Sequence, residues 1–427
     1  MPTDSPDLPP VAADPLSPGP QQIAAEPEEP AGMAPVLLAS LTAAAFLIFA
    51  QAFMVAPLTP RLAQVLNSST STIGLAVPAY LIPYGLMTLL WGPLSGRLGR
   101  RPVILASLAM FVVLTAATAM ADAAGPFVLL RLLTALGASA VVPVSLVLIG
   151  DLVPFQRRGQ ALGWLFGGMA GGIAVGSSTG ALLEPIVGWQ GLFLLVAALT
   201  VPVLLALASP RLLPGRPRAQ PAPSPRQIAR GYAALLRLPR GRRTYAFVLL
   251  NGMLHSGVYS WMGLYLDRRF GLGPVAIGLT LLGYGVPGLL LGTRIGRIAD
   301  MHGRRRLIPA GVAVAAGCAL LLAAPLPLFA VAIVVLVLSL GYDMTQPPLA
   351  GIVTDLPGHR ELAMGLNVFT LFVGLGVGAL LFQALLTLGY TTALLVFGGV
   401  AVLAAAAAVR LFAEEGPPKP APRGAAP

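Results

Sequence analysis

Four polar residues interrupt long apolar runs of the sequence: Gln51, Arg131, His255 and Asp343. A charged side chain placed in hydrocarbon costs about 2.5–3.5 kcal/mol, so such residues rarely face lipid. A buried carboxyl group such as that of Asp343 can exchange a proton near neutral pH or attract a cation, and a histidine titrates in the same range. These four residues are therefore our candidates for a substrate or proton pathway.

Each candidate also has a structural interpretation. Hydroxyl groups or a loop arginine could hold Asp343, and backbone carbonyls or Gln51 could hold Arg131. A lone histidine such as His255 is commonly a hydrogen-bonded packing residue. In the register of an internal repeat, Arg131 aligns with Val335, eight residues before Asp343, which is about 12 Å along a helix. We therefore expect no direct ion pair between Arg131 and Asp343.

A second set of charged residues stands in two loop motifs, GPLSGRLGRR at 92–101 and GRIADMHGRR at 296–305, which are 204 positions apart. The second motif contains Asp300, whereas the first has Gly96 at that place. Charges at helix ends can pair in one conformation and separate in another, which predicts a conformational lock; the alternative is plain anchoring of arginines at the membrane surface. The candidate lock residues are Gly92, Arg97, Gly99, Arg100, Arg101, Gly296, Asp300, Gly303, Arg304 and Arg305.

The elements that position these residues are apolar helices. The chain has 427 residues, of which 56% are hydrophobic and only 10% charged, against about 25% charged in soluble domains. Apolar runs long enough to cross a bilayer as helices lie near 35–58, 72–94, 103–121, 126–150, 160–183, 189–209, 244–266, 274–295, 307–324, 328–350, 363–386 and 390–412. Barrel strands would alternate polar and apolar residues, so we predict an all-α membrane protein with twelve transmembrane helices.

The repeat divides these runs into two related sets. Asp151 and Asp355 also stand 204 positions apart, and internal repeats of this size are typical of transporters. The predicted organisation is an acidic, proline-rich disordered tail (1–33), a six-helix bundle (34–210), a basic linker (211–243), a second six-helix bundle (244–412) and a short tail (413–427). Within the linker, Gln227 to Leu238 suits a short surface helix or a plain solvated loop.

The distribution of arginine predicts the orientation. Nine arginines fall between Arg211 and Arg243, and most others lie in loops on the same side. Because positive residues near span ends stay in the cytoplasm, we expect both termini to be cytoplasmic in a multi-pass protein of the cell membrane. The net charge of +11 is thereby explained by topology, so we expect no nucleic acid partner.

Several classes of enzyme are disfavoured by composition. Three histidines and a single cysteine, Cys318, give no metal-ligand cluster and no disulfide within the chain. Lysine occurs only at position 419, so a phosphate-binding Gly-x-x-x-x-Gly-Lys-Ser/Thr loop is absent. We expect no enzyme activity, no cofactor and no metal.

The loop motifs resemble those of the major facilitator superfamily, whose signature reads roughly Gly-x-Leu-Ala-Asp-Arg-x-Gly-Arg-Arg. The residues that match it in the first copy are Gly92, Leu94, Ser95, Arg97, Gly99, Arg100 and Arg101. The run GIAVGSSTGA (172–181) is similar to the superfamily's antiporter motif Gly-x-x-x-Gly-Pro-x-x-Gly-Gly, with Ser177 in place of proline and Ala181 in place of the last glycine. The resemblance covers about residues 35 to 412 and is nearest to the twelve-span drug:proton antiporters.

The resemblance implies two pseudo-symmetric six-helix bundles, the major facilitator fold, and secondary transport by alternating access. It further implies proton-coupled efflux of hydrophobic or cationic small molecules by a monomer in the lipid bilayer, with Gln51, Arg131, His255 and Asp343 on the pathway. Uptake or efflux of a small polar metabolite such as a sugar is the alternative, and a non-transporting receptor or scaffold is a more distant one. Residues that could line a hydrophobic cavity, or simply pack, are Met253, Tyr259, Trp261, Tyr265 and Phe369.

Overall fold

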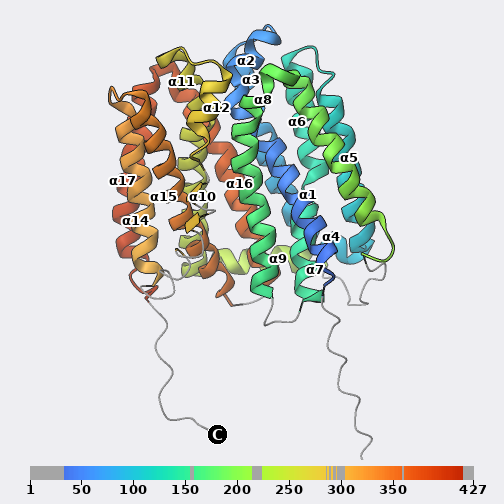
Figure 1. Ribbon diagram of the computed structural model, residues 1–427. Coiled ribbons are helices and arrows are strands. Elements are labelled where there is room, and N and C mark those ends of the chain that lie inside the picture. Colours follow the sequence, from blue (N-terminus) through green and yellow to red (C-terminus); the bar gives the residue numbers. More distant parts are fainter. Residues whose placement is uncertain are drawn as a thin grey trace, which may run out of the picture.

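The computed structural model describes residues 33–153, 158–213, 224–284, 286–287, 290–291, 295, 303–357 and 360–416. The acidic tail up to residue 32, most of the short C-terminal tail, and part of the linker therefore lie outside the described residues. Within the described part, the regular elements are helices that run side by side, and one helix, α9, crosses one end of the bundle (Figure 1). We call this end the linker end, and the end that carries α2 and α11 the far end.

Long apolar segments form helices because a helix satisfies its own backbone hydrogen bonds where lipid offers none. The residue bounds of the first half are α1 Pro35–Phe53, α2 Val55–Val65, α3 Thr70–Gly74, α4 Pro78–Leu98, α5 Arg100–Thr118, α6 Ala124–Ala138, α7 Val141–Leu152 and α8 Arg158–Ala208. Helix α8 contains two helical segments, because Gly188 at its kink has a positive φ of 70°. The predicted fifth and sixth spans are these two segments.

The second half follows the same plan. Its bounds are α9 Pro225–Arg237, α10 Pro239–Ser260, α11 Met262–Phe270, α12 Pro274–Leu281, α14 Arg304–Ala323, α15 Leu328–Thr354, α16 Arg360–Leu385, the short 3₁₀ helix η2 Leu386–Leu388, and α17 Tyr390–Leu411. In the described part of the chain, nine helical stretches are long and apolar enough to cross a membrane. The number twelve stays a prediction, since residues 285–302 are described only in part.

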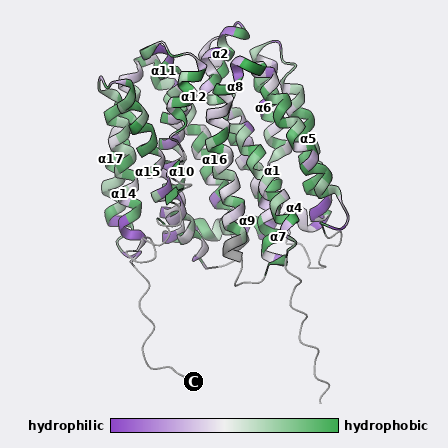
Figure 2. Cartoon of the chain, viewed as in Figure 1, coloured by the Kyte–Doolittle hydropathy of each residue, from purple (hydrophilic) through white to green (hydrophobic). Residues whose placement is uncertain are grey.

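The distribution of hydrophobic and hydrophilic residues over the bundle fits a membrane-spanning protein. Figure 2 shows hydrophobic residues along the outer helices and hydrophilic residues gathered where α5 and α14 begin, at the linker end. Both helices begin with the arginines of the two loop motifs. The all-helical membrane fold predicted from the sequence is confirmed.

Glycines let helices within each half approach closely. A Cβ atom at Gly172 of α8 would overlap the carbonyl oxygen of Phe46 in α1. In the second half, a Cβ atom at Gly378 of α16 would overlap the carbonyl oxygen of Met253 in α10. The glycine-rich run of the fifth span therefore serves close packing of helix on helix, where lipid supplies no hydrophobic driving force.

The two halves touch each other at the far end. A Cβ atom at Gly263, in the first turn of α11, would lie 3.0 Å from the Cα and the carbonyl oxygen of Pro57 in α2. The Gln383 amide of α16 donates a hydrogen bond of 2.8 Å to the carbonyl of Ser71 in α3. These contacts hold the far ends of the halves together in the present conformation.

Helix α9 connects the halves at the linker end. Its first turn is fixed by a capping box, in which the Ser224 backbone N–H donates to Gln227 Oε1 at 2.7 Å. Its apolar face buries Leu235 against the second half. The Tyr232 hydroxyl donates to the carbonyl of Leu89 in α4 at 3.1 Å, and burial raises the pKa of Tyr232 to about 12. Of the two options left open by the sequence, the chain adopts the short helix.

Candidate functional site

The guanidinium of Arg131, in α6, is surrounded by hydrogen-bond acceptors and a tyrosine ring of the first half. Its Nη1 donates to Gln51 Oε1 at 2.7 Å and to the Gln51 carbonyl at 3.2 Å, and its Nη2 donates to the carbonyl of Ala52 at 2.9 Å. Its Nε reaches the carbonyl of Ala76 at 3.4 Å, and the guanidinium lies 4.3 Å from the ring centroid of Tyr80. Arg131 has no exposed surface. The guanidinium therefore ties α6 to α1 and to the start of α4, with its donors in use.

His255 of α10 occupies the repeat position of Gln51 and also joins two inner helices. Its Nδ1 lies 3.1 Å from the carbonyl oxygen of Asn251, and its Nε2 lies 3.1 Å from that of Leu338 in α15. The Thr345 hydroxyl donates to Asn251 Oδ1 at 2.8 Å, and the Asn251 amide donates to Gln346 Oε1 at 3.3 Å. Sequence reasoning missed Asn251 and Thr345, although Asn251 and His255 stand one helical turn apart.

Asp343 of α15 has few partners. The Ser339 hydroxyl is 3.5 Å from Asp343 Oδ2, at the limit of a hydrogen bond. Among the described residues Asp343 forms no ion pair, and its side chain is only partly buried. No ion pair joins it to Arg131, as expected from the repeat register. Of the ionisable groups nominated within the spans, Asp343 is the one that retains open hydrogen-bonding capacity.

An aromatic cluster from both halves adjoins Tyr80, the ring beneath the Arg131 guanidinium. Phe49 of α1 packs edge-on against Tyr84 of α4 at 6.0 Å and against Phe372 of α16 at 5.8 Å, and Tyr84 lies 4.7 Å from Phe372. The hydroxyl groups of Tyr80 and Tyr84 are buried and have no hydrogen-bonding partner in the described part of the protein. Sequence reasoning missed this cluster, because single aromatic residues in apolar runs carry no signal of their own.

The aromatic residues nominated from the sequence have varied surroundings. Trp261 donates from its indole nitrogen to the carbonyl of Ala379 at 3.0 Å, and Tyr265 donates to the carbonyl of Leu322 at 3.0 Å. Both therefore support packing at the far end. Tyr259 instead stacks on Tyr284 with ring centroids 3.8 Å apart.

The loop motifs build equivalent structures in both halves. Gly99 and Gly303, which are repeat partners, cap α5 and α14 with φ of 89° and 76°, a conformation that essentially only glycine adopts. The next residue in each copy forms an ion pair with the acid that ends the following span: Arg100 with Asp151, and Arg304 with Asp355. The invariant element of the two motifs is thus a glycine turn followed by a paired arginine.

The remaining lock residues differ between the halves. Arg101 donates through Nη2 to the carbonyl of Ala208 at the end of α8, at 2.6 Å, whereas Arg305 donates its backbone N–H to the carbonyl of Glu415 at 2.9 Å. Gly92 lies within α4 and Arg97 in its last turn. Gly296 and Asp300 lie outside the described residues, so the acid of the second motif remains a prediction.

Glu415, which the sequence did not single out, is the centre of a charged cluster after α17. Its carboxylate binds Arg240 at 2.7 Å and also Arg243, both at the start of α10. Asp355 lies 4.0 Å from Arg240, which links this cluster to the Arg304–Asp355 pair. Burial alone would raise the pKa of Glu415, but hydrogen bonds and charge from Arg240 and Arg243 lower it below the ordinary value.

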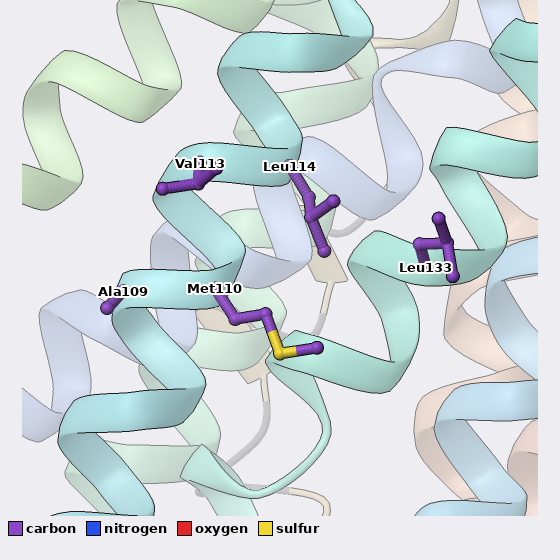
Figure 3. Close-up of a pocket in the computed structure, with 5 residues that line it drawn as sticks. All are labelled: Ala109, Met110, Val113, Leu114 and Leu133. Atoms are coloured by element: carbon purple, nitrogen blue, oxygen red, sulfur yellow. The ribbon is translucent and has the colours of Figure 1, made fainter.

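An outward-facing groove between α5 and α6 carries no functional group. Figure 3 shows its five apolar side chains, which are Ala109, Met110, Val113, Leu114 and Leu133. Met110 and Val113 are 47% and 65% exposed on the outer surface of the bundle. We do not assign this groove to the pathway.

Comparison with known proteins identifies relatives over most of the chain. The family model described as Major Facilitator Superfamily matches residues 41–379 and again residues 270–427. The uncharacterized MFS-type transporter YwfA of Bacillus subtilis (strain 168) is 28% identical over 375 residues, which cover 86% of this chain and 90% of that protein.

Two further similarities are narrower or more distant. A chloramphenicol resistance protein of Pseudomonas aeruginosa is 36% identical over 141 residues, which cover 33% of this chain and 34% of that one. The crystal structure of a D-xylose-proton symporter superposes with a TM-score of 0.71 at 17% identity, over 90% of this chain and 98% of that one. The latter likeness concerns the fold.

Proposed function

Because the chain belongs to the major facilitator superfamily, we propose that this membrane transporter exports hydrophobic or cationic small molecules in exchange for protons. The two halves rock about the inner helices and expose a central site alternately to each side. The termini and α9 lie on the cytoplasmic side, and the protein acts as a monomer in the cell membrane.

The observation that carries the proton-coupling proposal is the difference in partners among the buried ionisable groups. The Arg131 guanidinium donates hydrogen bonds to Gln51 and to backbone carbonyls, and both ring nitrogens of His255 lie near carbonyl oxygens. Asp343 has one long contact and no ion pair in the part of the chain described. A carboxyl group without a fixed cation can gain and lose a proton during each cycle, so Asp343 is the proposed proton carrier.

Efflux is favoured over uptake by two features. The chain is similar to a protein named for chloramphenicol resistance, and the run that ends in Ser177 is similar to an antiporter motif. The aromatic cluster around Phe49 and Phe372 suits hydrophobic cargo, since both halves contribute rings to it.

The loop motifs act as state locks in this proposal. The pairs Arg100–Asp151 and Arg304–Asp355 fix the linker ends of the spans within each half. Asp300 adds a charge that pairs in one state and separates in the other, while Gly96 leaves the first half with the weaker lock.

The test is transport by purified protein in proteoliposomes with an imposed pH gradient. A panel of chloramphenicol, tetraphenylphosphonium, D-xylose and citrate separates hydrophobic or cationic cargo from small polar metabolites. We expect the gradient to drive uphill transport in the parent protein, and Asp343→Asn to lower transport to the passive level. Glu414→Gln, an exposed acid outside the spans, is the matched control and retains uphill transport. Gradient-driven accumulation by Asp343→Asn would refute the assigned proton carrier.

A further inference from the structure

Three arginines form a row along one side of the linker helix α9. Arg226, Arg230 and Arg237 are exposed, and they lie within about 40° of one another around the axis of a helix with 3.6 residues per turn. Leu235, nine residues after Arg226, is buried on the opposite side of the same helix. We call the three arginines the arginine stripe.

The buried side of α9 fixes the direction in which the stripe points. Leu235 belongs to one buried cluster with Val353, near the end of α15, and Ala363, near the start of α16. Because α9 lies across the linker ends of the membrane-spanning helices (Figure 1), its opposite side faces the aqueous phase. A partner of the stripe must therefore approach from the aqueous phase.

The stripe has no counter-ion in the described part of the protein. None of its guanidinium groups forms an ion pair or a side-chain hydrogen bond with a residue that the structure describes. Three acids at the linker end, Asp151, Asp355 and Glu415, pair with other arginines. The stripe is thus a positive surface open to an acidic partner.

The N-terminal tail of the same chain has the complementary charge. Residues 1–32 contain six acids and no lysine or arginine. Helix α1 ends at Phe53, directly before α2 at the far end, so it begins at the linker end and the tail joins it there. An extended chain spans at most about 3.6 Å per residue, which keeps Glu26 within about 25 Å of Met33.

The spacing of the nearest acids matches the spacing of the stripe. Glu26 and Glu29 are about 10 Å apart in an extended chain, and Arg230 and Arg237 are about 10.5 Å apart along the helix axis. Glu28 stands between the two acids. We propose that the acidic tail docks on the arginine stripe of α9 through the segment 26–29. This inference goes beyond the proposed transport function and does not depend on it.

Covalent attachment makes weak ion pairs sufficient for docking. A single exposed ion pair contributes little to binding, because both ions are well hydrated and salt screens their attraction. A segment joined to the same chain by a few residues, however, has an effective concentration of about millimolar at its site. The tail therefore occupies the stripe at low salt and leaves it at high salt.

Carbodiimide cross-linking of the full-length protein in lipid nanodiscs tests the docking. Lysine occurs only at position 419, so Arg230→Lys keeps the charge and adds a primary amine that the reagent couples to a carboxylate in contact. Arg410→Lys, exposed in the last turn of α17 at the same end of the bundle, is the matched control. Peptide mass spectrometry should find about fivefold more cross-links to the segment 26–29 from position 230 than from position 410.

Charge variants separate docking from proximity alone. In the Arg230→Lys protein, replacing Arg226 and Arg237 by Gln should lower cross-linking about fivefold. Raising the salt from about 0.1 M to about 1 M should do the same, because the Debye length falls from about 10 Å to about 3 Å. A further control neutralises the three acids farther from α1, which are Asp4, Asp7 and Asp14. Cross-linking should be unchanged in that control, and an unfolding scan confirms that each variant is folded.

The other possible occupants of the stripe give different results. Absence of cross-links from position 230 to the tail would mean a solvated stripe and overturn the proposal. Cross-links that persist in full without Arg226 and Arg237, or in about 1 M salt, would mean proximity alone and overturn it too. With the tail as occupant, the yield is the same in phosphatidylcholine and phosphatidylglycerol nanodiscs. Loss of the tail cross-links in phosphatidylglycerol would assign the stripe to lipid headgroups instead and overturn docking of the tail.

Discussion

At the linker end, the two halves of this protein carry the same groups in the same places, Arg100 with Asp151 and Arg304 with Asp355. In the middle of the bundle they carry different ones. The first half holds Arg131 among oxygen acceptors, and its repeat partner in the second half is the apolar Val335. The two halves therefore share one ion pair at the ends of their spans and differ at the centre of the bundle.

The two halves also differ at a second pair of repeat partners near the centre of the bundle. Ser139 is the repeat partner of Asp343, and it accepts a hydrogen bond of 2.7 Å from the Trp91 indole. In the first half that position thus joins α4 to the inner helices, whereas in the second it carries a carboxyl group without an ion pair in the described structure. The first half thus surrounds its buried charge with acceptors, whereas the carboxyl group of the second half has few partners in the described structure.

The sharpest test of this comparison is removal of the buried charge in the first half. Arg131→Gln leaves several carbonyl oxygens without donors, so we expect a loss of stability of about 3 kcal/mol or more. His255→Gln keeps a side-chain donor in the second half, and we expect a smaller loss of about 1 kcal/mol. Cys318 is the single cysteine of the chain and is 3% exposed, so a thiol-reactive fluorophore reports unfolding of both variants directly.

Equal losses in the two variants would break the comparison, because they would mean that both centres are structural. A second measurement is the transport rate of both variants at a temperature where both are folded. Arg131→Gln should then keep its dependence on the pH gradient, since the proposed proton carrier, Asp343, lies in the other half.

The parts that could be predicted from the sequence follow from local rules. The length of each apolar run predicts where a membrane-spanning helix forms. Gly99 and Gly303 could be recognised as equivalent positions from their repeat spacing alone. The pairing of Arg131 with Gln51 was one of two open interpretations, because helix rotation is needed to decide which groups meet. The stacking of Tyr259 on Tyr284 could not be predicted, since it depends on how α10 packs against the turn after α12.

Glu415 offers a second way to sharpen the comparison, with a smaller effect. Its partner Arg240 aligns with Val36, and Glu415 itself aligns with Arg211, so the first half has no equivalent cluster. Arg240 is 39% exposed, and screening limits the expected loss in Glu415→Gln to about 1 kcal/mol. Glu414→Gln, one residue away and exposed, should change stability little.

The effect of Glu415 should depend on pH with a definite sign. Because its pKa is lowered in the folded protein from an ordinary value of 4.5, its contribution is complete above that value and is lost as the pH falls through the folded pKa. The difference in unfolding temperature between the parent protein and Glu415→Gln should accordingly be largest near neutral pH and shrink below about pH 4.5. A difference that grows on acidification would contradict the assigned ion pairs.

The smallest expected effect concerns the loop pairs, which the comparison treats as equivalent. Double-mutant cycles with Arg100→Gln and Asp151→Asn, and with Arg304→Gln and Asp355→Asn, should give coupling energies of about 0.2–1 kcal/mol that fall at high salt. We expect the coupling in the second half to be the weaker one, because Asp355 keeps Arg240 at 4.0 Å when Arg304 is replaced. Adding Arg240→Gln to the second cycle should restore its coupling to that of the first. If the couplings still differ after that change, the duplicated loops have diverged in energy as the centres have in chemistry, and the two locks must then be assigned separate roles.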